Sequence, residues 1–180
     1  MTSLVPPPTL AQLDDARRVV AEHLEPTPTV TLELRDRPVR AKLESLQVTG
    51  AFKIRGGLAA LAAARREGAG AVITASAGNH GLGVAHASRV LGVPATVVVP
   101  ANASVAKVAK LRRYDIELIQ FGSSYDEAQA QAMALAARRG VRYVSAFNDP
   151  DVIAGQSTVF DEMLAQAPDL GRLVSGRHAL

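Results

Sequence analysis

The hydrophobic and polar positions of the chain follow two alternating patterns over most of its length. Short apolar runs are typical of buried strands, and longer segments with an apolar residue every three or four positions are typical of helices. The strands predicted in this way span 72–75, 95–99, 116–121 and 143–146. The helices that follow them span about 80–91, 104–113, 125–139 and 153–164. Strands that alternate with helices indicate crossover connections and a parallel sheet, so the fold class is α/β.

The first 70 residues show a different order of elements. Their pattern predicts a helix over about 9–24, a hairpin of strands 30–34 and 39–43, and a helix over about 51–67. Thr9 and Thr49 are the expected N-caps of these helices, and Gly68 and Gly70 end the second one. The turn 35–38 joins the two strands of the hairpin.

A parallel sheet also indicates where a ligand binds. In open sheets of this kind, ligands lie outside the carboxyl ends of the strands. The loops that follow Ala75, Val99, Phe121 and Phe147 are therefore the places where we expect functional residues.

Composition narrows the class of protein. The chain has 180 residues, of which 48% are hydrophobic and 21% are charged, and this balance excludes disorder as the main state. It contains no cysteine, which excludes thiolate metal sites, cysteine nucleophiles and disulfides. The four histidines lack the spacing of a metal site, so no metal is expected.

The distribution of charge argues against two kinds of partner. The net charge is +3, the basic residues occur in ones and twos, and only 4% of residues are aromatic, a combination that does not favour nucleic-acid binding. No apolar run reaches the length of a membrane span, and no secretory signal precedes Pro8. We therefore expect a cytoplasmic protein with no nucleic-acid or membrane partner.

Asp161 and Glu162 are predicted to be charged residues on the surface of the last helix.

The loop 76–83, Ser-Ala-Gly-Asn-His-Gly-Leu-Gly, is the first segment with chemical content. Its glycines permit a tight turn, and the free N–H groups at the start of the next helix favour an anion such as a phosphate or a carboxylate. A connection that simply needs glycine, with Ser76 or Asn79 as the helix cap, explains the loop equally well. A dinucleotide fingerprint needs a different glycine spacing and an acid after the second strand, which ends at Val99 without one. A nucleotide-binding Rossmann-like module is therefore only an alternative.

The segment 49–57, Thr-Gly-Ala-Phe-Lys-Ile-Arg-Gly-Gly, places Lys53 in the first turn of a predicted helix. A lysine there is usually exposed or extends its amine to the surface. If Lys53 were partly buried beside the positive helix start, its pKa would fall and its neutral amine would be available to a carbonyl carbon.

Together these segments resemble a known family, the fold-type II pyridoxal-phosphate enzymes, and within it the threonine and serine dehydratases and their serine racemase relatives. The resemblance covers nearly the whole chain. It rests on Glu25-Pro-Thr-Pro28, Lys42-x-Glu44, Gln47-x-Thr-Gly-Ala-Phe-Lys53-x-Arg-Gly56, Ser76-Ala-Gly-Asn-His80, Lys110-Leu-Arg-Arg-Tyr114 and Asp149-Pro-Asp-Val-Ile-Ala-Gly-Gln156. Members similar to cysteine synthase would carry Ser-Val-Lys-Asp-Arg and Thr-Ser-Gly-Asn-Thr instead.

The resemblance implies a cofactor, pyridoxal 5'-phosphate, and roles for particular residues. Lys53 would bind the cofactor covalently and then act as the base at the substrate Cα. Asn79 would hydrogen-bond the 3-hydroxyl group of the cofactor, and Phe52 would pack beside it. The clamp for the substrate carboxylate would consist of Ser76, Ala77, Gly78, Asn79 and His80.

The implied reaction is a β-elimination on a small amino-acid substrate such as threonine or serine. Proton removal at Cα and loss of the β-hydroxyl group lead to a 2-oxo acid and ammonia. Ala77 stands where the racemase relatives carry a serine, so the resemblance favours a dehydratase over a racemase.

The resemblance also implies a division of the chain within the tryptophan synthase β-like fold. Residues 1–68 would belong to a large domain that carries the lysine, 69–147 would form a small, mini-Rossmann-like α/β subdomain, and 148–180 would return to the incomplete large domain. The strand that precedes the family's glycine-rich phosphate loop would begin at 169–174, but no glycine run follows. We therefore expect the N-terminal part of a family member. An inactive remnant or a regulatory partner of a longer homologue is the alternative, and the oligomeric state, a homo-oligomer included, stays open.

Overall fold

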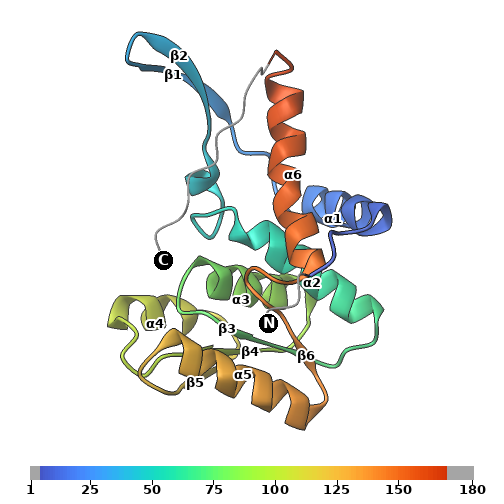
Figure 1. The fold of residues 1–180 in the computed structure, drawn as a ribbon, viewed down its shortest axis with the longest axis vertical. Coiled ribbons are helices and arrows are strands. Elements are labelled where there is room, and N and C mark those ends of the chain that lie inside the picture. Colours follow the sequence, from blue (N-terminus) through green and yellow to red (C-terminus); the bar gives the residue numbers. More distant parts are fainter. Residues whose placement is uncertain (1–4, 170–180) are drawn as a thin grey trace.

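The apolar runs form one parallel sheet in the computed structural model, which describes residues 5–169 (Figure 1). The strand order is β5-β4-β3-β6, and every neighbouring pair is parallel. The strands are β3 (Val72–Ala75), β4 (Ala95–Val99), β5 (Glu117–Gln120) and β6 (Arg142–Tyr143). All residues of β3 and β4 are buried, as expected for a parallel sheet that helices cover on both faces. The predicted parallel α/β arrangement is confirmed.

Three helices cover the two faces of the sheet. They are α3 (Asn79–Leu91), α4 (Val105–Leu111) and α5 (Tyr125–Arg139). Ile73 and Val98 pack against small and apolar residues of α5, whereas Val97 packs against α3 and α4 on the opposite face. This alternation follows from the period of two along a strand.

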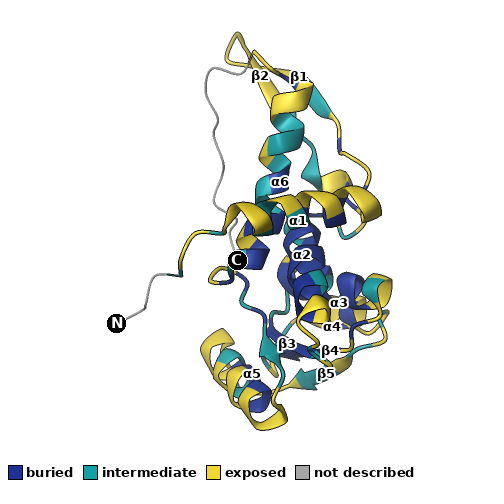
Figure 2. Cartoon of the chain, turned by 90° about the vertical axis from the view of Figure 1, so that its right-hand side faces the viewer, coloured by how far each residue is buried: buried dark blue, intermediate teal, exposed yellow. Residues whose placement is uncertain are grey.

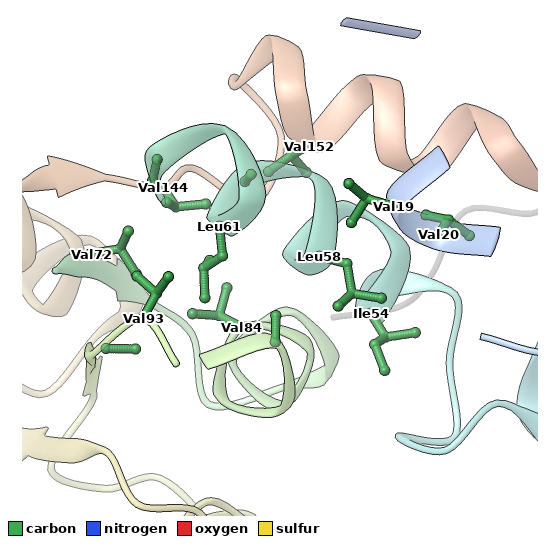
Figure 3. Packing of buried hydrophobic residues seen from close by; sticks show 14 of the residues in the cluster. Val19, Val20, Ile54, Leu58, Leu61, Val72, Val84, Val93, Val144 and Val152 are labelled. Atoms are coloured by element: carbon green, nitrogen blue, oxygen red, sulfur yellow. The ribbon is translucent and has the colours of Figure 1, made fainter. Parts of the chain in front are cut away.

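A second layer of helices packs on α3, on the side away from the sheet. It consists of α1 (Leu10–His23), α2 (Lys53–Arg66) and α6 (Pro150–Gln166). Helix α2 lies at the centre of this layer and is buried along most of its length (Figure 2). Figure 3 shows Leu61 of α2 beside Val84 of α3, and Leu58 of the same helix nearer to Val19 of α1. Most of the core therefore surrounds the helix that begins at Lys53.

The two strands near the N-terminus, β1 (Thr29–Leu34) and β2 (Arg37–Lys42), form a hairpin that projects beside α6 (Figure 1). Arg35 and Asp36 form its tight turn, and both have positive φ angles, 51° and 59°. That is the backbone geometry that suits the twist of a two-residue hairpin. The turn is shorter than the predicted 35–38, because Pro38 already lies in β2 opposite Glu33. A short 3-10 helix, η1 (Glu44–Leu46), follows the hairpin.

Helix starts account for the main differences from the predicted elements. Helix α2 begins at Lys53 without a side-chain cap, and the Thr49 hydroxyl donates to the Ala51 carbonyl instead, so the predicted Thr49 cap is wrong. Helix α6 begins at Pro150, three residues before the predicted start, because Asp149 caps it by accepting from two backbone N–H groups. The Thr9 cap of α1 is confirmed.

Two further points concern the limits of the chain that the structure describes. The strand expected at 169–174 lies almost wholly outside the described residues. None of the helices within residues 5–169 combines the length and the apolar character that crossing a bilayer requires.

Candidate active site

A cleft of about 930 Å³ opens at the start of α2. Its walls come from five parts of the chain: the end of β2 with η1, the turn before α2, the start of α3, the segment after β6, and one face of α6. Phe52, Lys53 and Asn79 all line it, so the structure brings together three residues that lie in two separate sequence motifs.

The Lys53 side chain is half-buried and points its amine toward the segment after β6. Lys53 Nζ donates to the Ala146 carbonyl oxygen at 3.1 Å. It also lies 4.6 Å from the centre of the Phe147 ring and 5.3 Å from that of Phe52. Burial lowers the pKa of Lys53, and the amine forms no ion pair within residues 5–169 that would raise it again. The neutral amine is therefore more accessible at neutral pH than that of an ordinary surface lysine.

The backbone of Lys53 lies against a glycine of α3. A Cβ atom at Gly83 would lie 2.8 Å from the Lys53 carbonyl oxygen, closer than real Cβ atoms approach. On the other side of the turn, a Cβ atom at Gly155 of α6 would overlap the Arg55 carbonyl oxygen. The first turn of α2 is thus enclosed between α3 and α6, and both contacts require glycine.

Asn79 is the first residue of α3 and the part of the 76–83 loop that reaches the cleft. Gly78 is the N-cap of α3 and provides no side chain, while Ser76 Oγ accepts from the Gly78 N–H at 3.1 Å. Neither Ser76 nor Asn79 caps the helix, so the predicted cap is wrong. The loop does need glycine, because a Cβ atom at Gly81 would overlap the Ser76 carbonyl oxygen. The uncapped first turn favours the interpretation as an anion site.

His80 is buried beside the cleft and does not line it. The residue is only 3% exposed, and neither nitrogen of its ring has a hydrogen-bond partner within the described residues. Burial, followed by the positive charge of Lys53, lowers the pKa of His80 to about 4. The Val144 backbone nearby, which does not meet hydrogen-bond geometry with the ring, acts in the opposite direction. His80 is therefore uncharged at neutral pH. Ser76, Ala77 and Gly78 are likewise absent from the cleft lining.

Two side chains of the cleft, the aromatic ring of Phe147 and the amide of Gln156, were not assigned a role from the sequence. Phe147 lies over Lys53 Nζ, and the only signal for it was its place at the end of a predicted strand. Gln156 lines the cleft with both polar atoms of its amide buried and without partners in the described part of the chain. The next residue, Ser157, also lines the cleft, but its hydroxyl donates to the Ala154 carbonyl of its own helix. Of the four loops predicted to carry function, only those after β3 and β6 reach the cleft.

The chain is similar to known proteins over nearly its whole length. A family model described as pyridoxal-phosphate dependent enzyme matches residues 20–176. An L-threonine ammonia-lyase of Geobacter sulfurreducens is 45% identical over 138 residues, which cover 76% of this chain and 34% of the relative. An L-threonine ammonia-lyase of Thermotoga maritima is 36% identical over 182 residues, which cover 93% of this chain and 45% of the relative.

Solved structures give the same result for the fold. A pyridoxal 5'-phosphate-dependent aspartate racemase matches with a TM-score of 0.83 at 35% identity, covering 91% of this chain and 53% of the racemase. A bacterial threonine deaminase, from T.th., matches with a TM-score of 0.80 at 38% identity, covering 92% of this chain and 54% of the deaminase. The chain thus spans a third to a half of the length of these curated relatives and about half of these solved chains.

Proposed function

Because the chain belongs to the pyridoxal-phosphate dependent enzyme family, we propose that Lys53 is its cofactor-binding lysine and that the cleft serves a β-elimination on a small hydroxy amino acid. The family and the fold expected from the sequence are confirmed by the match of the family model and by the solved structures. The activity, the substrate and the role of each residue are our proposals.

One observation carries this proposal: an amine that has no ion pair within residues 5–169 lies in a large cleft between two aromatic rings. Carbonyl groups react with the neutral form of lysine, and partial burial favours that form of Lys53. The cleft volume of about 930 Å³ falls within the range of pockets that hold cofactors and small ligands. The residues present therefore fit the group that the family uses.

When bound, pyridoxal phosphate draws electron density away from the substrate Cα. The chain supplies the remaining functions. Lys53 Nζ removes a proton at Cα, and the Ala146 carbonyl oxygen orients Nζ by accepting its hydrogen bond. Phe52 and Phe147 exclude water from the amine, and the amide of Asn79 lies on the wall of the same cleft, where it would orient the cofactor ring. The N–H groups at the start of α3 would hold the substrate carboxylate.

The lyase outcome is supported by the names of the relatives, two of which are L-threonine ammonia-lyases. The resemblance supports it as well, because Ala77 stands where the racemase relatives carry a serine, and a methyl group has no proton to donate. We further propose the domain division made above, because α6 packs on α1 and α2 rather than on the sheet.

The proposal is tested by locating the covalent adduct of pyridoxal phosphate. The chain contains four lysines: Lys42, Lys53, Lys107 and Lys110. After incubation with the cofactor and reduction with borohydride, mass spectrometry should find the adduct at Lys53, and Lys53→Ala should abolish it together with the visible absorption band. Lys107→Ala, on the exposed surface of α4, is the matched control and should leave both unchanged.

Equal labelling of all four lysines would contradict the assignment of Lys53. The reaction is tested separately by release of ammonia from threonine or serine. An adduct at Lys53 without ammonia release would favour the alternative of a non-catalytic partner.

A further inference from the structure

A buried cluster of charged side chains lies beside Lys53 and has no part in the chemistry proposed above. The Arg55 side chain is completely buried. Its guanidinium donates two hydrogen bonds to the Glu44 carboxylate, both 2.8 Å, and two to the Glu162 carboxylate, 2.6 and 2.9 Å. A fifth bond, 3.1 Å, goes to Thr158 Oγ1. All five N–H groups of the guanidinium are thus used, four of them in bidentate pairs of fixed geometry.

Lys42 completes the cluster. Its side chain is 4% exposed, and Nζ lies 2.6 Å from Glu162 Oε2. The same ammonium donates to the Thr27 carbonyl oxygen and to Gln166 Oε1, so its three donors are all used. Two cations and two carboxylates balance in charge within this Arg55 cluster, which we define as Lys42, Glu44, Arg55, Thr158 and Glu162. The sequence-based reading of Glu162 as surface charge is therefore wrong, because only 17% of its side chain is exposed.

Together with Thr27, the Arg55 cluster joins four segments of the chain. Thr27 precedes β1, and its hydroxyl donates to Glu44 Oε1 at 2.6 Å. Lys42 ends β2, Arg55 lies in the first turn of α2, and Glu162 lies in α6, 107 positions after Arg55.

Burial and charge act in opposite directions on the pKa values of Arg55 and Glu162. Burial alone would lower the pKa of Arg55 and raise that of Glu162, but their hydrogen bonds reverse both directions. Both groups are therefore charged at neutral pH.

Arg55 is placed where it can control Lys53. The two residues share the first turn of α2, and the guanidinium anchors this turn to η1 on one side and to α6 on the other. The close contacts at Gly83 and Gly155 leave the turn no room for a compensating shift. A rotation of α2 about its axis would break the bidentate pairs and would also move Lys53 Nζ away from the Ala146 carbonyl and the Phe147 ring.

We propose that the Arg55 cluster is a positioning device that holds the first turn of α2 so that Lys53 Nζ stays between Ala146 and Phe147. Lys42 and Glu44 also lie on the cleft wall, but none of the four charged residues forms a hydrogen bond or ion pair with Lys53 Nζ, so we treat them as positioning residues. Buried ion pairs of this kind commonly add little net stability over apolar side chains, which favours a geometric role over a purely stabilising one. The inference rests on the proposed function only in taking Lys53 as the reactive lysine.

The test measures the pKa of Lys53 without any cofactor. Competitive acylation over a range of pH, read by mass spectrometry, gives a separate value for each of the four lysines. Burial is the cause of the lowered pKa of Lys53. Removal of the negative charge in Glu162→Gln would by itself lower the pKa of a nearby lysine, and Arg55→Lys leaves the charge of the Arg55 cluster unchanged. The titratable group electrically linked to Lys53 is His80, which is neutral above about pH 4. A rise in the pKa of Lys53 therefore reports a loss of burial, that is, a displaced side chain.

We expect Glu162→Gln and Arg55→Lys to raise the pKa of Lys53 and to lower its reactivity at pH 7 by about threefold or more, which corresponds to roughly half a pKa unit. Asp161→Asn is the matched control on α6, because Asp161 is an exposed partner of Arg17. Leu135→Ala is the control for lost stability alone, since it opens the core beneath α5, on the far face of the sheet. Both controls should leave the reactivity of Lys53 unchanged.

Unchanged reactivity in Glu162→Gln and Arg55→Lys, or an equal change in Leu135→Ala, would overturn the positioning role. If both charge variants fail to fold, Thr158→Val decides. It removes one of the five hydrogen bonds of Arg55, together with the bond from Thr158 Oγ1 to the Gly155 carbonyl, and keeps the shape of the side chain. A smaller loss of reactivity is expected there, and wild-type reactivity would overturn the proposal. Absence of the borohydride-trapped adduct at Lys53 in the wild-type chain would instead overturn the proposed function, whatever the acylation result.

Discussion

Burial lowers the pKa values of two neighbouring side chains, Lys53 and His80. Lys53 and His80 are both bases whose pKa values fall, because the protein surroundings disfavour their charged forms. For Lys53 the result is a more reactive amine. For His80 it is an uncharged ring whose two nitrogens lack partners in the described region. Such a ring costs stability and makes the fold sensitive to acid.

We predict that His80→Leu makes the fold less sensitive to mild acid. In the wild-type chain the pKa of His80 is about 4 when folded and close to 6.5 when unfolded, so between these values the unfolded state binds more protons. The free energy of unfolding therefore decreases as the pH falls from 6.5 to 4, by about 2 kcal/mol between pH 7 and pH 5. Urea denaturation at these two pH values should show that most of this loss disappears in His80→Leu.

His86→Leu is the comparison for this variant. Burial and then the charge of Arg89 lower the pKa of His86, so the effect should have the same sign and a smaller size. If His80→Leu loses as much stability as the wild-type chain between pH 7 and pH 5, the buried neutral state of His80 is wrong.

At the level of the elements, the position of α2 decides the geometry of the site. The helix begins at the reactive lysine, and its first turn contacts α3 and α6 through backbone atoms. A Cβ atom at Gly57 would lie 2.7 Å from the Gly83 backbone, so α2 and α3 approach each other through a pair of glycines. Close approach of two backbones is the reason for glycine here, in spite of its low helix propensity.

We predict that Gly83→Ala destabilises the fold by about 1–3 kcal/mol, the usual range for an overpacked core. Its new methyl group would meet backbone atoms of Lys53 and Ile54, which cannot rotate away. The gain in helix propensity, about 1 kcal/mol, offsets only part of this cost. Gly70→Ala is the matched control, because no atom of the described residues lies within 4 Å of a Cβ atom there. Urea denaturation should leave this control at or slightly above wild-type stability, and an equally stable Gly83→Ala would contradict the close approach.

At the level of the whole molecule, α6 and the neighbouring hairpin both carry exposed apolar side chains. On α6, Ile153, Phe160 and Leu164 are exposed, and their spacing of seven and four places them on one stripe of the helix. The adjacent hairpin exposes Leu32 and Leu34. The two elements are held together by hydrogen bonds such as that from Thr29 Oγ1 to Gln166 Oε1. Exposed apolar side chains on neighbouring elements favour self-association.

We predict that Leu164→Lys combined with Leu34→Lys reduces self-association and the fluorescence of a bound apolar dye. Both side chains are more than half exposed, 59% and 61%, so the free energy of unfolding should change by no more than about 0.5 kcal/mol. Val105→Lys on α4 is the control, since Val105 is 85% exposed but lies away from α6 and the hairpin. Analytical ultracentrifugation and dye titration measure the two effects. An equal response of the control would show that these exposed side chains have no special role.

The sequence by itself determined the order and type of the elements, the parallel α/β sheet, the family and its cofactor. These follow from signals that are local in the chain: apolar runs of strand length, helical periodicity, and short motifs around Lys53 and Asn79. The role of a single residue could not be predicted wherever a contact with another segment of the chain decides it. Thr49 has the chemistry of a cap, but α2 begins four residues later, at Lys53.

Only the tertiary structure decided which motifs meet and what they do to one another. Arg55 and Glu162 look like ordinary charged positions of two helices, and their pairing across 107 positions depends on how α2 and α6 cross. The same packing brings Phe147 over Lys53 and buries the ring of His80. The pKa values and the orientation of the reactive amine are therefore properties of the fold, because burial and ion pairing arise only when distant segments come together.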